Sequence, residues 1–262
     1  MNIPSYERVV CLTEEPTEIL YLLGEEQRIV GISAYTERPA QAKKDKPVVS
    51  AFIDGSVPKI QALKPDLVIG FSDIQAKLAS ELIAAGLTVI IFNQRSLEEI
   101  LGVVQAIGRL VGAGDKAADL CADLARRIDE AKVRNALREQ RPKVYFEEWP
   151  DPMISAIQWV SELIGVAGGT DIFAAKSAGS LASERFIASD DVLAAQPEVM
   201  LASWCGKPFD EAAVRARPGW NDLPALRDKR VFEIDPSIIL QPGPASILAG
   251  LPELERCIHG ES

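Results

Sequence analysis

Two segments of this chain carry the same pattern 132 positions apart, and this repeat constrains the fold more than any other feature. In residues 62–69 and again in residues 194–201, a helix end leads through a proline and an acidic residue into an apolar run. Two further pairs keep the same order along the chain, namely residues 8–10 with 143–145 and residues 18–24 with 160–168. Matches that recur in one order predict the internal duplication of a single structural unit.

Each half alternates segments of strand and helix character. Residues 66–70 and 87–92 are continuous apolar runs of strand length, which is typical of strands buried in a parallel sheet. Residues 74–85 between them have helical spacing, and a capping box at 96–99 begins another helix that runs to about residue 111. This alternation predicts a Rossmann-like α/β lobe with a parallel sheet in each half.

The segment at 115–140 contains neither proline nor glycine and predicts one long helix. Its apolar residues Leu120, Leu124, Ile128 and Ala131 share one side, while charged residues fill the other faces. We therefore expect three parts: an N-terminal α/β lobe at 1–112, a connecting long helix at 113–141 and a C-terminal α/β lobe at 142–262.

Charge and composition narrow the function. Lys and Arg number 28 against 38 Asp and Glu, and the resulting net charge of −10 argues against nucleic acid as a partner. No apolar run approaches the roughly 20 residues that span a bilayer, so the chain is not expected to be embedded in a membrane. The only histidine, His259, is expected to be a tail residue, which excludes internal Ser-His-Asp relays and multi-histidine metal sites.

The beginning of the chain and its cysteines bear on the compartment. The first residues lack the basic and apolar regions of a secretory signal, and the four cysteines are scattered without a CxxC motif. As written, the sequence predicts a cytoplasmic protein; it predicts a periplasmic one if it is a mature form that was recloned with a new Met1.

Aromatic residues follow four of the expected strands. Tyr35 follows the strand at 28–32, Phe71 ends the strand at 66–70, Trp149 follows 143–146, and Trp204 follows 199–202. Ligands of parallel sheets lie outside the carboxyl ends of the strands, so these aromatics predict a site for a flat, largely apolar ligand. The alternative is that each aromatic only packs at the edge of its lobe.

Two other features have a chemical and a structural interpretation. Cys205 lies at a strand end, where a thiolate could ligate cobalt or iron, although a small buried thiol is the commoner case. Glu147, Glu148 and Asp151 could form an acid/base pair or a hard-metal site, but such residues more often cap a helix or hold a loop.

Residues 148–152 read EWPDP and are followed by Gln158 and Trp159. This segment resembles the E-W-x-D-P-P-F…G-H-W signature of the cobalamin-binding branch of the helical-backbone class (class III) of ABC-transporter substrate-binding proteins, a class that handles cobalamin, ferric siderophores and haem. The similarity extends over nearly the whole chain, with its other best pieces at 17–24, 30–33, 62–69, 205–206, 216–220, 223–226, 230–232 and 242–244. The resemblance implies two lobes joined by one long helix, with a ligand cleft between the lobes and no catalysis.

The resemblance also implies roles for particular residues. It places the aromatics of the first lobe at Tyr35, Phe52 and Phe71, while the aromatic and histidine of the branch signature fall on Ile154 and Gln158. The predicted ligand-binding residues are Tyr35, Phe52, Phe71, Trp149, Trp204, Cys205 and Ser237. Members that dock on a permease use one acidic residue per lobe: Asp190 matches the second, but the first falls on Pro58.

The favoured interpretation is a binding protein that holds a cobalamin-like corrinoid without turnover, needs no cofactor and acts alone or with an ABC permease. Ferric-siderophore or haem binding, and a cytosolic corrinoid carrier or regulatory module, are the alternatives. A metal-chelatase-like enzyme is less favoured, because such enzymes usually recruit internal histidines or paired cysteines.

Overall fold

The computed structural model describes residues 5–51 and 53–260 and divides into two compact units. Unit 1 comprises the chain up to Gln94 together with Glu98–Ala125, and unit 2 comprises Arg95–Leu97 together with the chain from Arg126 onward. The division falls within one long helix, α6 (Gly114–Ala136), so each unit contains part of it.

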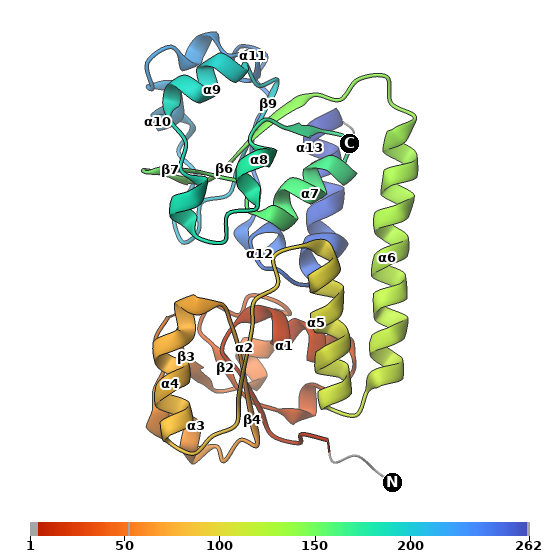
Figure 1. The fold of residues 1–262 in the computed structure, drawn as a ribbon, viewed down its shortest axis with the longest axis vertical. Coiled ribbons are helices and arrows are strands. Elements are labelled where there is room, and N and C mark those ends of the chain that lie inside the picture. Colours follow the sequence, from red (N-terminus) through yellow and green to blue (C-terminus); the bar gives the residue numbers. More distant parts are fainter. Residues whose placement is uncertain (1–4, 52, 261–262) are drawn as a thin grey trace. The chain divides into compact units, whose positions relative to one another are not determined.

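Unit 1 is built on a five-stranded parallel sheet with the order β3-β2-β1-β4-β5. Helices α3 and α4 lie on one side of this sheet, with α1 and α5 on the other (Figure 1). The order reverses between β1 and β4, which is the topological switch point of a doubly wound sheet. The elements are β1 (Val9–Cys11), α1 (Glu14–Leu22), β2 (Ile29–Ser33), α2 (Ala42–Asp45), β3 (Val48–Ser50), α3 (Val57–Ala62), β4 (Leu67–Phe71), α4 (Ala76–Ala84), β5 (Val89–Phe92) and α5 (Leu97–Leu110).

Unit 2 is built around the eight-residue strand β6, in a sheet with the order β10-β9-β6-β7. Strands β10, β9 and β6 run parallel, the short β8 pairs with the start of β6, and β7 pairs antiparallel with its end. The elements are β6 (Lys143–Pro150), β7 (Met153–Ser155), α7 (Gln158–Val166), β8 (Thr170–Asp171), α8 (Ala174–Ser177), α9 (Ser189–Ala195), β9 (Val199–Ala202), α10 (Glu211–Arg215), α11 (Pro224–Arg227), β10 (Val231–Glu233), α12 (Pro236–Ile239), a π-helical turn (Ser246–Gly250) and α13 (Leu251–His259).

The repeated segments occupy equivalent places in the two sheets. Strand β4 pairs in parallel with β1, and β9 pairs in parallel with β6. The acidic residue after each proline explains the pattern, because Asp66 accepts the Arg8 amide at 2.9 Å and Glu198 accepts the Lys143 amide at 2.8 Å. Each carboxylate thus satisfies the first backbone donor of the neighbouring strand and fixes its register.

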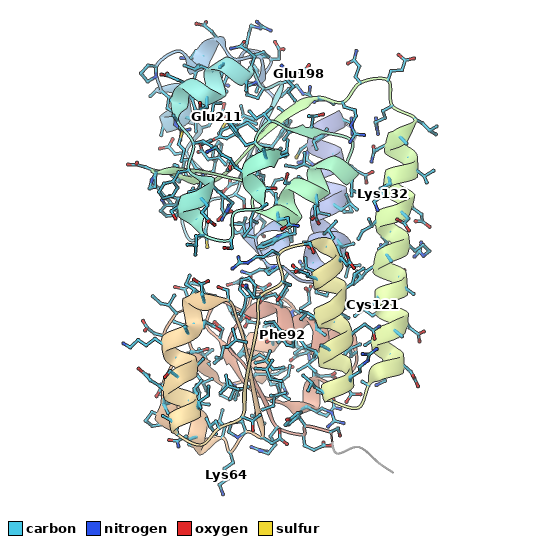
Figure 2. The ribbon with its side chains drawn as sticks, viewed as in Figure 1. Lys64, Phe92, Cys121, Lys132, Glu198 and Glu211 are labelled. Carbon is cyan, nitrogen blue, oxygen red and sulfur yellow. The ribbon has the colours of Figure 1, made fainter. Side chains whose placement is uncertain are left out.

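The residue before each of these prolines also adopts the same conformation. Lys64 has φ 48° and Gln196 has φ 52°, both in the left-handed region that side chains with a Cβ seldom enter. Lys64 lies before β4 and Phe92 ends β5, so these two labelled residues mark the amino-end and carboxyl-end edges of the unit 1 sheet (Figure 2).

The sequence places the α/β architecture and the main strands correctly, but two boundaries differ. The strand predicted at 143–146 continues to Pro150, because β7 pairs with its second half and arginines donate hydrogen bonds to the carboxylates of Glu147 and Glu148. The helix predicted to end at residue 140 ends at Ala136. There the chain tightens, with the Arg138 amide bonded to the Asn135 carbonyl, and Leu137 is left 83% exposed.

Three residues of the predicted apolar stripe of α6, Leu124, Ile128 and Ala131, are buried and Leu120 is half-buried, whereas Val133 on the same helix faces solvent. Ile128 is 5% exposed and Val133, five residues later on the same helix, is 66% exposed. We expect Ile128→Ala to destabilise the protein by about 2–4 kcal/mol through a core cavity, and the matched Val133→Ala to change stability by less than about 0.5 kcal/mol. Denaturant unfolding measures both, and equal losses would contradict this assignment of faces.

Helix α1 begins with two buried carboxyl groups. Glu14 is 3% exposed and Glu15 is 1% exposed. Burial raises the pKa of Glu14 to about 8, opposed by a bond from the Glu37 amide and reinforced by repulsion from Glu18, Glu15 and Glu37. Burial likewise raises the pKa of Glu15 to about 7. Both groups therefore bind protons more tightly in the folded chain than in the unfolded one.

This linkage makes stability fall as the pH rises. The contribution of both groups is complete below their ordinary pKa of 4.5 and is lost as the pH passes about 7 and 8. We expect melting at pH 9 to lie at least about 3 °C below melting at pH 6, since ~1 kcal/mol corresponds to about 2–4 °C at this chain length. Glu14→Gln with Glu15→Gln should remove most of that difference, and the exposed Glu81→Gln should leave it in place; an unchanged difference in the double variant would refute the assignment.

Candidate ligand site

Two predicted aromatics lie at the carboxyl-end edge of the unit 1 sheet. Phe71 is the last residue of β4 and is 8% exposed, and Tyr35 lies in the loop after β2 with 56% of its surface exposed. Phe52 lies outside the described residues. Of the two described aromatics, Tyr35 presents the larger surface to a ligand.

A buried glutamine fixes the position of Phe71 at the switch point. The Gln75 side chain accepts the Phe71 amide at 2.9 Å and donates to the Leu12 carbonyl at 3.2 Å. A Cβ at Gly70 would lie 2.4 Å from the Gln75 Oε1 atom, so glycine is required for this close approach. The ends of β1 and β4 are thereby tied together where a doubly wound sheet binds its ligand.

The two tryptophans of unit 2 differ in exposure. Trp149 lies in the second half of β6, is half-buried, and donates from Nε1 to the Asp151 carbonyl at 2.9 Å. Trp204 is 2% exposed, packs edge-on against Phe209 at 5.1 Å, and lies 5.3 Å from the Lys207 ammonium. Trp149 therefore has exposed ring surface that a ligand could contact, whereas Trp204 could contact a ligand only if the side chains that cover it moved.

The acidic residues of β6 are held by arginines. Glu147 is fully buried and accepts two bonds from Arg217, at 2.6 and 3.0 Å, one from the Tyr145 hydroxyl at 2.7 Å and one from Trp204 Nε1 at 3.1 Å. Glu148 accepts two bonds from Arg185, at 2.5 and 3.0 Å. A paired, fully bonded carboxylate stabilises its surroundings and has no free oxygen for proton transfer, which agrees with the structural interpretation of these residues.

Cys205 lies in the loop after β9, and Ser237 lies in the first turn of α12, after β10. Cys205 is exposed, and partial removal of water from its sulfur, together with the charge of Glu148, raises the pKa of the thiol. Ser237 is half-buried at the start of α12, where its amide donates to the Asp235 carboxylate at 2.8 Å. A thiol with a raised pKa is a poor metal ligand at neutral pH. Among residues 5–51 and 53–260, no group of three His, Cys, Asp or Glu side chains could hold a metal ion.

The histidine prediction is wrong in one respect. His259 is the last residue of α13 rather than a loose tail residue, and its Nε2 atom lies 2.7 Å from the Ala167 carbonyl oxygen. Gln158, which stands where the branch signature has a histidine, begins α7 and donates to Glu162 at 2.9 Å. Ile154 is 8% exposed in β7, beside Trp149 in the antiparallel pair.

Sequence reasoning missed a set of polar residues at the carboxyl-end edge of unit 1. The residues are Thr13, Glu14, Glu15, Thr17, Thr36 and Ser50, each at most 5% exposed and each with at least one side-chain oxygen that has no hydrogen-bond partner. No sequence signal distinguishes them, because acidic residues and threonines are ordinary at the start of a helix and in a turn.

The predicted docking residues are exposed. Asp190 lies in the first turn of α9, and Pro58 lies in the first turn of α3 beside the exposed Lys59. Within the described part of the chain, no helix is both long enough and apolar enough to cross a membrane.

Comparison with known proteins places the chain in a family. The profile of the periplasmic binding protein family matches residues 9–238. An uncharacterized ABC transporter substrate-binding lipoprotein of Bacillus subtilis is 26% identical over 265 residues, which cover 98% of this chain and 81% of that protein. A vitamin B12-binding protein of Vibrio parahaemolyticus is also 26% identical, over 98% of this chain and 90% of its own.

Solved structures show the same fold. The periplasmic heme-binding protein of Roseiflexus sp. RS-1 has a TM-score of 0.81 at 25% identity and matches 98% of this chain and 99% of its own. The periplasmic vitamin B12 binding protein of Vibrio cholerae has a TM-score of 0.75 at 22% identity, over 97% of this chain and 96% of its own.

These matches agree with the geometry, in which Glu147 and Glu148 of β6 are paired with arginines. Proteins of this kind bind a solute without converting it and need no cofactor to do so. The chain therefore belongs to the periplasmic binding protein family and is a non-catalytic, two-lobed α/β substrate-binding protein.

Proposed function

We propose that this protein binds a cobalamin-like corrinoid. The observation that carries the proposal is the 26% identity to a vitamin B12-binding protein over 98% of the chain. The aromatics at the carboxyl-end edges of the two sheets add to it. Similarity to a heme-binding protein makes haem the main alternative, and a ferric siderophore is a further one.

The chemistry of the ligand fits these residues. A corrin ring is a wide, largely apolar disc with polar groups around its rim, so its binding site needs aromatic walls and a few hydrogen-bonding groups. Tyr35 in unit 1 and Trp149 in unit 2 each have exposed ring surface at the carboxyl-end edge of their sheet. Phe71 and Trp204 are buried at the same edges.

The ligand is tested by spectrophotometric titration with cobalamin, cobinamide, haem and a ferric siderophore. We expect micromolar or tighter binding of the two corrinoids, and loss of about 1–3 kcal/mol of binding energy in Trp149→Ala or Phe71→Ala. Tyr6→Ala, at the amino end of β1, is the matched aromatic control and should bind normally. Tyr35→Phe separates the alternatives, since it keeps the ring for a corrinoid but removes a phenolate that haem iron could use. Binding of none of the four ligands would sink the proposal.

We further propose that Asp190 contacts an ABC permease, as the resemblance to transport-linked members suggests. Asp190 is exposed on α9, while the matching position in unit 1 carries Pro58 and the basic Lys59. Such a contact would therefore rest on a single carboxylate. A cytosolic corrinoid carrier is the alternative setting, and it requires no such contact.

The docking proposal is tested with a candidate ABC permease from the source genome, reconstituted in vesicles. Asp190→Asn should reduce stimulation of the permease ATPase by about 3-fold or more, because removal of one rim charge mainly slows association. Corrinoid affinity should not change, and Asp228→Asn, an exposed carboxylate elsewhere in unit 2, is the control. Full stimulation by Asp190→Asn would remove this residue from the contact.

A further inference from the structure

The start of α1 lies at the switch point of the unit 1 sheet and gathers oxygen atoms that lack partners. We call Thr13, Glu14, Glu15 and Thr36 the acid-hydroxyl cluster. Thr13 is the residue just before α1, and Thr36 lies in the loop after β2, next to Glu37, whose amide donates to Glu14. One oxygen of Glu14, both oxygens of Glu15 and both threonine hydroxyls have no partner with hydrogen-bond geometry.

Burial makes these unpartnered atoms informative. Thr13 is 2% exposed and Thr36 is fully buried, and the Thr13 hydroxyl faces the Glu15 carboxyl closely enough to favour its ionised form. A buried polar group without a hydrogen bond costs about 1–3 kcal/mol, and natural proteins seldom retain several of them in one place unless they serve a purpose.

The charges around the cluster exclude an ordinary structural ion pair. The carboxylates that act on Glu14 are those of Glu15, Glu18 and Glu37, and none of them supplies a positive charge. Arg38 lies near, but its Nε atom bonds Glu18 at 3.3 Å. This differs from unit 2, where arginines pair with both buried acids of β6, so the acids of α1 remain available to another molecule.

We propose that the acid-hydroxyl cluster binds primary amide groups on the rim of the ligand and rejects carboxylate groups. This inference rests on the proposed corrinoid function, since corrinoids such as cobinamide carry amide side chains around the ring, whereas haem carries propionates. The cluster would thus be a polar subsite that selects ligands whose rim groups carry no charge.

Hydrogen-bond complementarity supports this selection. A protonated carboxyl group has one donor and one acceptor side by side, as a primary amide does, so the two can pair through two parallel hydrogen bonds. Burial keeps the Glu14 carboxyl protonated at neutral pH. A carboxylate on the ligand would instead meet a site rich in acids, and the first turn of α1 already places its own Glu14 and Glu15 at the positive end of the helix.

A loop of unit 1 controls access to the cluster. The Glu37 amide donates to Glu14 at 3.2 Å, and the Arg38 contact with Glu18 holds the same loop against α1. Both distances lie at the long end of the normal range, so these contacts are weak. The exposed Tyr35 precedes them in the same loop, which therefore joins the aromatic surface to the polar cluster. A ligand amide would take the place of the Glu37 amide on the Glu14 carboxyl.

The test compares two corrinoids that share a ring and metal but differ at the rim. Dicyanocobinamide carries amides, and dicyanocobyrinic acid carries free carboxylates. The protein has a net charge of −10, so it disfavours the acid in any case, and the comparison needs a control for net charge. Glu14→Gln and Glu15→Gln, which replace carboxyls whose pKa burial raises, are therefore set against Glu81→Gln, which makes the same side-chain change at an exposed residue of α4.

We define the preference as the affinity for cobinamide divided by the affinity for cobyrinic acid. It should fall by about 5-fold or more in Glu14→Gln and in Glu15→Gln, mainly because these variants bind the acid more tightly. In Glu81→Gln it should change by less than about 2-fold. Thr13→Val, which removes a hydroxyl but no charge, should weaken cobinamide binding by about 3- to 10-fold and serves if a glutamine variant does not fold. Equal preferences in all three glutamine variants, with normal binding by Thr13→Val, would overturn the inference and leave corrinoid binding intact. Failure of the unaltered protein to bind either corrinoid would overturn the proposed function itself.

Discussion

Both units depend on the parallel pairing of two central strands, β1 with β4 and β6 with β9. Asp66 accepts the amide of Arg8, just before β1, and Glu198 accepts the amide of Lys143, the first residue of β6, so one carboxylate in each unit joins the starts of the two central strands. Parallel strands bring their carboxyl ends to one edge, and every residue that we assign to ligand binding lies at or next to such an edge. The repeated acid after proline is therefore the structural origin of the site.

The two units treat buried acids in opposite ways. In unit 2, Arg217 forms two bonds to the fully buried Glu147, and the charge is neutralised inside the protein. In unit 1, burial raises the pKa of Glu14 to about 8 and that of Glu15 to about 7, and nearby acidic residues reinforce both shifts, so these groups favour the protonated form. The first arrangement is stable over a wide pH range because the arginine remains charged. The second depends on pH and leaves hydrogen-bonding atoms unused.

Local patterns predicted the α/β class, the main strands and the buried stripe of α6, because apolar periodicity records which face of an element is covered. They could not place the end of β6, since it depends on a tight pairing with β7 and on bonds from Arg185 and Arg217, which lie far along the chain. They also could not show that Trp204 is packed by Phe209. The acids of α1 resemble an ordinary helix start, and only the tertiary structure reveals their burial.

The choice between a corrinoid and haem depends on whether a side chain at the carboxyl-end edges of the sheets could ligate the haem iron. His259, the only histidine, lies against the Ala167 carbonyl, and the pKa of Cys205 is raised, so neither is suited to ligate iron at neutral pH. Tyr35 is the exposed phenol at the edge of unit 1 and the residue through which haem ligation would have to act. A corrinoid brings its own axial ligands and asks the protein mainly for ring contact and rim hydrogen bonds. The aromatic residues at the sheet edges and the acid-hydroxyl cluster would meet those two needs for the corrinoid that we propose as the ligand.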